Sequence, residues 1–439
     1  MMFELSLYGG YSLSVFLVLV AGLLFIAIVD VEDKSYLAKL FFLFLIVGII
    51  LVPLFYQWMV AAGLDGYAFS DDRTYDEWSA EVARAWHQKR KHVGFGGDNQ
   101  GYLKFTAYLY YIFGQNTLMA RVTNIFFSAV CIIFVYKLAR LYLSRTIAKR
   151  AALITALMPT FMFWSINHFK EPLTILSTLL TVYAGSWLTV GKKITAQKVI
   201  LFVAAATVLY TLRFSAALML VMIFFGYYYL MSITNISFLR LILGALLFAA
   251  LLISVDRLTG EDTEDVTVKF EEKVGRSEGS SIGLHRDIEG STEAIMSYAK
   301  IGSYRQLYKL PLGICFTMII PYPPFPKIFD RRMRLPSRVL YGVNFIFVCM
   351  LAYVCIGFFH LLRRETLSSL LLYFTPFFFI MTIAIAHPGI LRYRDQWIPF
   401  FALLAAIGME HRKNHPVFIL LFNIVVIIIA PVGYWILKA

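Results

Sequence analysis

The chain has 439 residues, of which 59% are hydrophobic, 16% are aromatic and only 15% are charged, and its mean hydropathy is +0.71. This composition excludes a soluble globular protein and predicts an all-α polytopic membrane protein. The formal charge of +13 does not indicate nucleic-acid binding, because Lys and Arg in cytoplasmic loops explain a basic excess in a membrane protein. The four cysteines lie in apolar stretches and indicate no metal site.

Apolar segments long enough to cross the ~30 Å hydrocarbon core of a bilayer occur about twelve times along the chain. The predicted spans are residues 11–30, 37–59, 117–139, 151–169, 172–190, 198–212, 214–233, 238–256, 339–361, 368–386, 397–410 and 416–437. The first is expected to remain as a membrane helix, because no Lys or Arg precedes it and no cleavage pattern follows it. Residues 1–439 are therefore expected to form a single transmembrane domain.

The Lys and Arg residues of the short loops predict the orientation of the chain in the membrane. They cluster after the third, fifth, ninth and eleventh spans, and these loops alternate onto one face, which is expected to be cytoplasmic. The members of the clusters are Arg140, Arg145, Lys149, Arg150, Lys192, Lys193, Lys198, Arg363, Arg364, Arg412 and Lys413. Both chain termini and the two long loops, 60–116 and 257–338, are then expected on the external face.

The first external loop, residues 60–116, contains two segments with helical patterning. Residues 72–91 are acidic and compatible with a helix, and a Gly-rich turn follows at residues 94–97. Residues 102–111 are aromatic, amphipathic and too short to span, which predicts an interfacial helix in the headgroup plane. The second external loop, residues 257–338, begins with a polar section and later contains a proline-rich stretch through which no helix can continue.

An acidic run directly follows the second apolar span and contains the adjacent residues Asp71 and Asp72. Carboxylates held at the membrane surface can deprotonate a hydroxyl or amine acceptor, hold a divalent cation such as Mg²⁺ or Mn²⁺, or do both. A solvated connector is the alternative interpretation, because Asp, Ser and Thr are common in such segments.

Ionisable residues also interrupt the apolar segments in the middle of the chain. Lys170, Glu171 and Arg213 lie between predicted spans, where a charge is costly unless it is paired or faces a wet cavity. They are therefore candidate functional residues, although Lys170 and Glu171 at a tight external turn would equally suit pairing with each other or with lipid headgroups. Arg121, at the start of the third span, fits either an interfacial anchor or a polar cavity.

Two arginines, Arg392 and Arg394, lie in a short loop that the predicted topology places outside, against the usual charge bias. A guanidinium group binds phosphate oxygens through two parallel hydrogen bonds, so a lipid phosphate is the expected ligand. The sequence has no Gly-rich phosphate-binding loop, which argues against a nucleotide bound from the cytoplasm.

These features resemble the GT-C superfamily of integral-membrane glycosyltransferases, in particular the branch with protein O-mannosyltransferases and the lipid A aminoarabinose transferase. The similarity covers about residues 65–190, with a second patch at 387–408. Its motifs are Asp71-Asp72-Arg73-Thr74-Tyr75, Phe113-Gly114, Arg121 and Tyr136-Lys137-Leu138-Ala139-Arg140. One difference is that two apolar spans precede the acidic loop here, whereas the family usually has one.

The resemblance implies a glycosyltransferase that takes a sugar from a polyprenyl phosphate or diphosphate donor. It implies an envelope glycan, lipid or protein as acceptor, and an active site on the periplasmic or extracellular face of a bacterial inner membrane. The implied catalytic residues are Asp71, Asp72 and Glu171, with Asp71 activating the acceptor or, together with Asp72, binding any divalent metal. The resemblance implies Arg392 and Arg394 as ligands of the donor phosphate, and the further predicted substrate-binding residues are Tyr75, Lys104, Arg121, Lys170 and Arg213.

Two other functions are consistent with the same residues. An O-antigen or exopolysaccharide polymerase or ligase would use external arginines against a lipid diphosphate and perform the same bond-forming step. A flippase or transporter for lipid-linked sugars would move the substrate without making a glycosidic bond.

Overall fold

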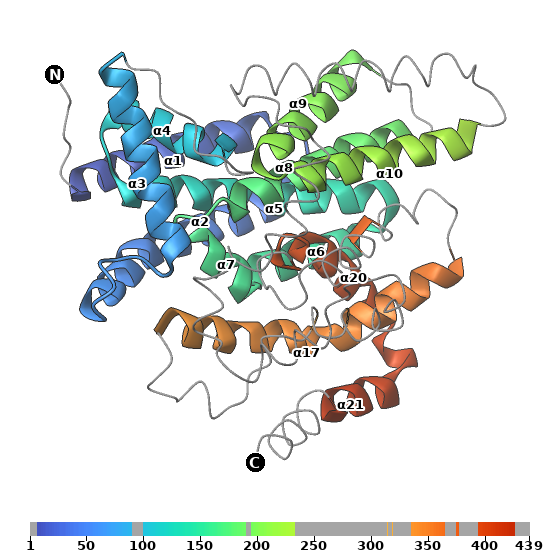
Figure 1. Cartoon of the computed structure of the whole chain (residues 1–439). Coiled ribbons are helices and arrows are strands. Elements are labelled where there is room, and N and C mark those ends of the chain that lie inside the picture. The colour runs from blue at the N-terminus through green and yellow to red at the C-terminus, as the bar shows by residue number, and fades with distance from the viewer. Residues whose placement is uncertain are drawn as a thin grey trace, which may run out of the picture.

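The computed structural model describes residues 7–89, 100–189, 195–232, 335–364 and 394–425, together with positions 314, 318, 375 and 376. Throughout these residues the chain forms helices and no β-strand, which confirms the predicted all-α class (Figure 1). The predicted span 238–256, most of the span 368–386 and most of the loop 257–338 lie outside the described residues.

Four described helices are long and apolar enough to cross a membrane. They are α1 (Leu7–Ile28), α2 (Lys34–Ala61), α5 (Thr117–Tyr142) and the Arg338–Leu362 part of α17 (Leu335–Arg364). Further helices that begin at or near predicted spans are α8 (Glu171–Thr189), α9 (Ala196–Leu212), α10 (Phe214–Ser232), α20 (Ile398–Glu410) and α21 (Pro416–Ile424). The chain is a multi-pass membrane protein, and the expected number of about twelve spans stays a prediction.

The predicted span 151–169 is wrong as a single helix. The structure divides this segment between α6 (Arg145–Leu157) and α7 (Pro159–Ser165), with Met158 between them in an extended conformation at φ −73° and ψ 112°. Proline disfavours the helical conformation of the residue before it and readily occupies the first position of a new helix, so the break follows from Pro159. The short helix α7 packs against α5 and α17 and ends at the turn that precedes Glu171.

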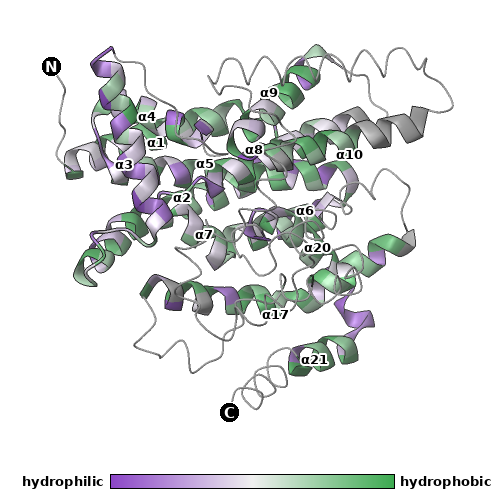
Figure 2. Cartoon of the chain, in the orientation of Figure 1, coloured by the Kyte–Doolittle hydropathy of each residue, from purple (hydrophilic) through white to green (hydrophobic). Residues whose placement is uncertain are grey.

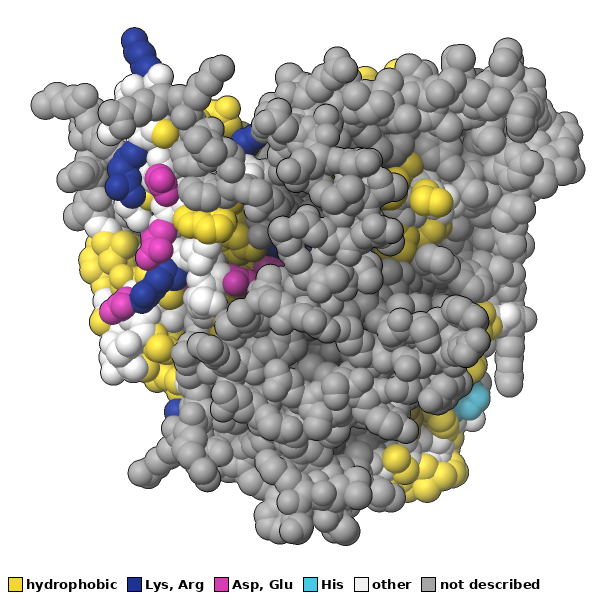
Figure 3. Space-filling view, viewed as in Figure 1, with side chains coloured by type: hydrophobic (Ala, Val, Ile, Leu, Met, Phe, Trp, Pro, Cys, Tyr) yellow, Lys and Arg dark blue, Asp and Glu magenta, His cyan; other side chains and the backbone are white. Residues whose placement is uncertain are grey.

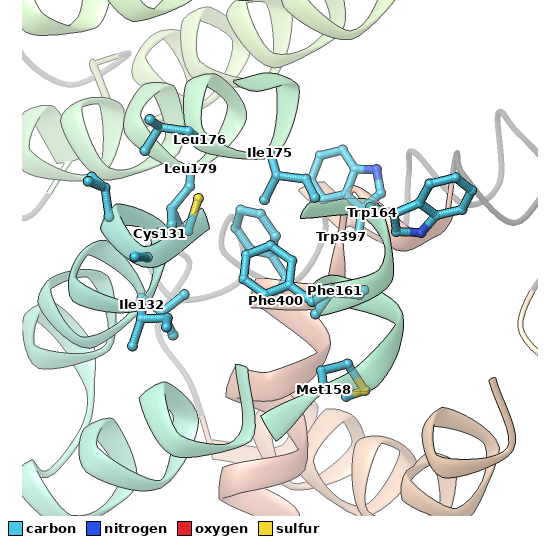
Figure 4. Packing of buried hydrophobic residues seen from close by; sticks show 14 of the residues in the cluster. Cys131, Ile132, Met158, Phe161, Trp164, Ile175, Leu176, Leu179, Trp397 and Phe400 are labelled. Atoms are coloured by element: carbon cyan, nitrogen blue, oxygen red, sulfur yellow. The ribbon is translucent and has the colours of Figure 1, made fainter. Parts of the chain in front are cut away.

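α5 lies at the centre of the described bundle, where it packs against α1, α2, α6 and α8. Most of its side chains are buried, so the helix is apolar on nearly every side instead of along one stripe. Figure 4 shows the core between α5, α7, α8 and α20, with Cys131, Phe161, Ile175 and Phe400 among its members. The outer faces of α1 and α2 expose apolar side chains, as expected of helices in contact with lipid tails.

The helices predicted within residues 60–116 are confirmed as α3 (Ser70–His87) and α4 (Gln100–Phe113), and the external, interfacial position of this region stays a prediction. The two helices pack on each other at one end of the bundle (Figure 1). Many residues of α3 are hydrophilic, whereas the long helices are mostly hydrophobic (Figure 2). The contact between α3 and α4 is made by small and aromatic side chains, among them Ala80, Ala83, Ala107 and Tyr110.

Charged side chains gather at the two ends of the bundle. One end, which we call the site end, is formed by α3, α4, the turn 166–170, Arg213 and the residues 394–397. The opposite end, which we call the basic end, is formed by the turn 29–33 and the neighbouring parts of α5, α6 and α20.

Candidate active site

α3 directs two carboxylates into the protein at the site end. Asp72 and Asp76 are four residues apart and therefore lie on the same face of the helix. Both are almost fully buried, whereas Glu77 and Glu81 are exposed. Acidic and basic side chains on the solvent face of this region are visible in the space-filling view (Figure 3). α3 thus separates buried carboxylates on one face from solvated charges on the other.

The Asp72 carboxylate links three segments of the chain. Its Oδ2 accepts hydrogen bonds from the backbone N–H of Ala68 at 3.0 Å and from Arg121 Nη2 at 3.2 Å. Its Oδ1 accepts a hydrogen bond from the backbone N–H of His168 at 2.9 Å. Arg121 is fully buried as well, and its Nη2 also donates to the Gly66 carbonyl at 2.8 Å. Breaking a buried ion pair costs about 3–5 kcal/mol, so this pair holds α3 against α5 and the turn after α7.

The Asp76 carboxylate collects a second set of buried donors. Its Oδ2 accepts hydrogen bonds from the Tyr67 hydroxyl and the Gln115 amide, both at 2.9 Å. Its Oδ1 accepts a hydrogen bond from the Tyr110 hydroxyl and lies 3.7 Å from His168 Nδ1. Burial and the nearby Asp76 carboxylate raise the pKa of Tyr67, so this phenol stays protonated and donates at neutral pH.

The two adjacent aspartates of α3 have different environments. Asp71, in the first turn, is half-buried, whereas Asp72 is fully buried, because successive residues point about 100° apart around a helix. The predicted residue Tyr75 is buried and packs edge-to-face on Tyr102, with ring centroids 5.4 Å apart. Sequence analysis missed Asp76, although its spacing of four residues from Asp72 is the signal that points to it.

A second group of predicted residues meets where α8 begins and α9 ends. Glu171 opens α8 with a side chain that is 1% exposed, and its Oε1 lies 3.6 Å from Arg213 Nη2. Lys170 is also buried, and its Nζ donates a hydrogen bond to the Leu212 carbonyl at 3.3 Å. The structure therefore brings these three ionisable residues together, while the predicted residue Lys104 lies half-buried on α4.

Arg394 is fully buried and is engaged by protein groups. Its Nη2 donates hydrogen bonds to Asp395 Oδ1 and to Asn344 Oδ1, both at 2.7 Å, and its guanidinium lies 4.1 Å from the centre of the Phe347 ring. Asp395 Oδ2 in turn accepts a hydrogen bond from the Trp164 indole at 2.8 Å. These contacts fit a residue that holds its loop in place against α7 and α17.

Gln396 joins this loop to the charges around α8. When its amide is oriented so that the oxygen faces Arg213, as the hydrogen-bond network requires, the oxygen accepts from Nη2 at 2.7 Å and from Nε at 3.0 Å. The segment 394–397 therefore contacts the first half of the chain through Arg213 and through Trp164. The other predicted phosphate ligand, Arg392, lies outside the described residues.

The described residues contain no group of three or more His, Cys, Asp and Glu side chains that could hold a metal ion. Both oxygens of Asp72 accept hydrogen bonds from N–H groups of the protein, so a cation at this carboxylate would compete with these donors. A divalent cation shared by Asp71 and Asp72 stays a prediction, and the proposed mechanism uses none.

The fold and the cluster of buried ionisable residues define a multi-pass α-helical membrane protein with a candidate active site at one end of its bundle. Residues 103–256 match the family model described as dolichyl-phosphate-mannose-protein mannosyltransferase. This is a glycosyltransferase family of the GT-C superfamily, and the match supports a membrane glycosyltransferase of the GT-C type, which the sequence motifs also predicted. Neither a curated protein nor a solved structure matches the chain.

The matched segment contains most of α4 and all of α5 to α10, and with them Arg121, Glu171 and Arg213. It begins after Asp71 and Asp72. The roles of this acidic pair therefore rest on the resemblance of the motif and on the geometry of α3.

Proposed function

We propose that the chain transfers a sugar from a polyprenyl phosphate or polyprenyl diphosphate donor to a glycan, lipid or protein acceptor on the external side of the membrane. The observation that carries this proposal is the convergence of four segments at the site end: α3, the turn before α8, the junction of α9 and α10, and residues 394–397. Together they offer a carboxylate for base chemistry and buried cations for a phosphate.

The external location is supported by the charges at the opposite end of the bundle. Arg140, Arg145, Lys149 and Arg150 all lie at the basic end, where they pair with acidic side chains. Lys and Arg accumulate in cytoplasmic loops, so the basic end is assigned to the cytoplasm. The site end then faces the outside, where the lipid carrier supplies the leaving group and no nucleotide is required.

Asp71 is assigned as the general base because Asp72, its neighbour, is occupied by the Arg121 ion pair. The Asp71 carboxylate takes the proton of an acceptor hydroxyl as the hydroxyl oxygen attacks the anomeric carbon of the donor sugar. The bond between that carbon and the donor phosphate oxygen breaks, and the phosphate leaves with the electron pair. A positioned base contributes roughly 10²- to 10⁴-fold to such a step.

Arg213 and Lys170 are assigned to the donor phosphate. Both are buried beside Glu171, and fixed cations in a site that excludes water stabilise the negative charge that develops on the leaving phosphate. Arg394 is assigned a supporting role, because its described contacts are with protein groups. Arg392 and Lys104 stay predicted phosphate ligands.

The test is a comparison of Asp71→Asn with Glu77→Gln, an exposed acidic residue of the same helix. The full-length protein in lipid nanodiscs is given a polyprenyl-phosphate hexose as donor and an alkyl glycoside as acceptor, and formation of the new glycoside is measured. Asp71→Asn should fold normally and lower the transfer rate at least ~100-fold, whereas Glu77→Gln should transfer at the wild-type rate. Near-normal transfer by Asp71→Asn would remove Asp71 from the role of base.

The same preparation separates the competing functions. If Asp71→Asn keeps full activity while Arg392→Ala abolishes it, a polymerase or ligase that depends on external arginines is the better description. If the wild-type protein moves the donor across a vesicle membrane but forms no glycosidic bond, the protein is a transporter and the proposal fails.

A further inference from the structure

Glu171 differs from the other buried carboxylates of the site end. Asp72, Asp76 and Asp395 each accept hydrogen bonds from two or more protein groups. In the part of the chain that the structure describes, neither carboxylate oxygen of Glu171 has a hydrogen-bond partner, although the side chain is only 1% exposed. Arg213 Nη2, at 3.6 Å, lies beyond the ~2.7–2.9 Å of a charge-assisted hydrogen bond.

A buried carboxylate with two open oxygens indicates a ligand that brings hydrogen-bond donors. Arg213 and the N-terminus of α8 supply positive charge that compensates the negative charge of Glu171. What the Glu171 carboxylate lacks is hydrogen-bond donors. An unsatisfied buried acceptor is destabilising, and most buried polar atoms in folded proteins do have a partner. Sugar hydroxyl groups are donors of the required kind, because a carboxylate can only accept from them.

The position of Glu171 relative to Arg213, the residue assigned to the donor phosphate, indicates which hydroxyl of the donor sugar would donate to it. The donor phosphate is attached to the anomeric carbon, and the hydroxyl on the adjacent ring carbon is close to it. Because Glu171 Oε1 lies 3.6 Å from Arg213 Nη2, a phosphate bound to Arg213 brings this hydroxyl within reach of the carboxylate. The base assigned to the acceptor, Asp71, lies on a different element, α3.

We infer that Glu171 is a specificity residue that accepts a hydrogen bond from the donor-sugar hydroxyl next to the anomeric carbon. The inference rests on the proposed function for the identity of the ligand. It adds that the site selects donors with a free hydroxyl at this carbon over 2-deoxy donors, because a site built to bind a hydroxyl rejects an analogue without it.

The experiment measures dissociation constants of three ligands for the full-length protein in lipid nanodiscs. They are a polyprenyl-phosphate hexose, its 2-deoxy analogue and sugar-free polyprenyl phosphate. The wild type should bind the hexose donor roughly ten- to a hundredfold more tightly than the 2-deoxy donor, as a hydrogen bond to a charged group provides. In Glu171→Gln this ratio should fall below about threefold, with binding of sugar-free polyprenyl phosphate unchanged.

Two variants accompany this measurement. Glu77→Gln, on the exposed face of α3, should keep the wild-type ratio. If Glu171→Gln gives no folded protein, Glu171→Asp keeps the charge, withdraws the carboxylate by one methylene group and should show the same loss of discrimination.

Several results would overturn the inference. They are a wild type that does not discriminate, an unchanged ratio in Glu171→Gln, or equal weakening of all three ligands, which would show that Glu171 is only the ion-pair partner of Arg213. The proposed function fails by a different result, namely no glycosidic bond formed from the hexose donor by the wild type. If the wild type forms no bond but still binds the hexose donor more tightly than the 2-deoxy donor, the binding role of Glu171 is retained.

Discussion

The site end and the basic end both carry ion pairs, but the Asp72–Arg121 pair of the site end and the Arg150–Glu410 pair of the basic end differ in exposure. Asp72 and Arg121 at the site end have side chains with 0% exposure, whereas Arg150 and Glu410 at the basic end are each 42% exposed. Exposed pairs contribute about 0.2–1 kcal/mol, while breaking a buried pair costs about 3–5 kcal/mol. The Arg150–Glu410 pair therefore has little effect on stability, whereas the Asp72–Arg121 pair fixes the positions of helices that build the candidate active site.

Asp33 is intermediate between these two cases. Its carboxylate, at the basic end, is 4% exposed, but its partners Arg145 and Lys149 are 58% and 34% exposed. It also accepts a hydrogen bond from the Tyr136 hydroxyl at 2.6 Å. The hydrogen bond from Arg145 lowers the pKa of Asp33 well below its usual range. Four substitutions, taken from the largest expected effect to the smallest, test whether exposure is what separates the two ends.

Arg121→Met should cause the largest loss of stability. The substitution leaves the Asp72 carboxylate buried without its cation, so the free energy of unfolding should fall by about 3–5 kcal/mol. Adding Asp72→Asn should restore part of the loss, because no unpaired buried charge remains. Unfolding of the purified protein in detergent, followed by circular dichroism, measures both variants. A loss below about 1 kcal/mol would place this pair with the exposed ones.

Asp76→Ala should rank second. It removes the acceptor of Tyr67, Tyr110 and Gln115 and leaves buried donors unsatisfied, at a cost of about 2–3 kcal/mol. Hydrogen exchange of the α3 amides should be faster in this variant. Glu77→Ala, at the exposed next position, is the matched control and should change stability by about 0.5 kcal/mol or less. Equal losses in the two variants would contradict the role given to Asp76.

Asp33→Asn tests the intermediate case through pH. Because the pKa of Asp33 is lower in the folded protein than its unfolded value of about 3.9, its stabilising contribution is present above about pH 5 and is lost progressively below about pH 4. The wild type should therefore lose stability more steeply than Asp33→Asn below about pH 4, by about 1 kcal/mol given the exposure of the partners. Parallel curves of unfolding temperature against pH for the two proteins would contradict this.

Arg150→Gln should have the smallest effect. Its partner Glu410 is as exposed as Arg150 itself, so the free energy of unfolding should fall by about 0.5 kcal/mol or less. The difference from the wild type should disappear at about 1 M salt, where charges more than about 3 Å apart are screened. A loss above about 2 kcal/mol that persists in salt would mean that the basic end also holds the fold together.

The helices were predictable wherever the signal is local. An apolar run of the right length and a charge that interrupts it can both be recognised within a short stretch of sequence. For this reason the predicted spans begin within a few residues of α2, α5, α9 and α10. The split between α6 and α7 differs from the single predicted span because Pro159 ends the helix within a continuous apolar run.

The candidate site was predictable in part for the same reason. Lys170, Glu171 and Arg213 stand out because a charge beside an apolar span is costly, and the structure does place them together. Asp76 and Asp395 did not stand out, because their importance comes from the groups that meet them. Asp395 receives its hydrogen bond from Trp164, which is 231 residues away along the chain.

Composition and the length of the apolar runs were enough to establish a multi-pass helical membrane protein. The reason is that a helix must contain about 20 mostly apolar residues to cross the bilayer. Only long-range packing places Asp72, and not its neighbour Asp71, in a buried ion pair with Arg121. Only long-range packing leaves both carboxylate oxygens of Glu171 without a hydrogen-bond donor. The physical reason is that the state of a buried charge depends on the donors and counter-ions around it, and folding brings these together from distant parts of the chain.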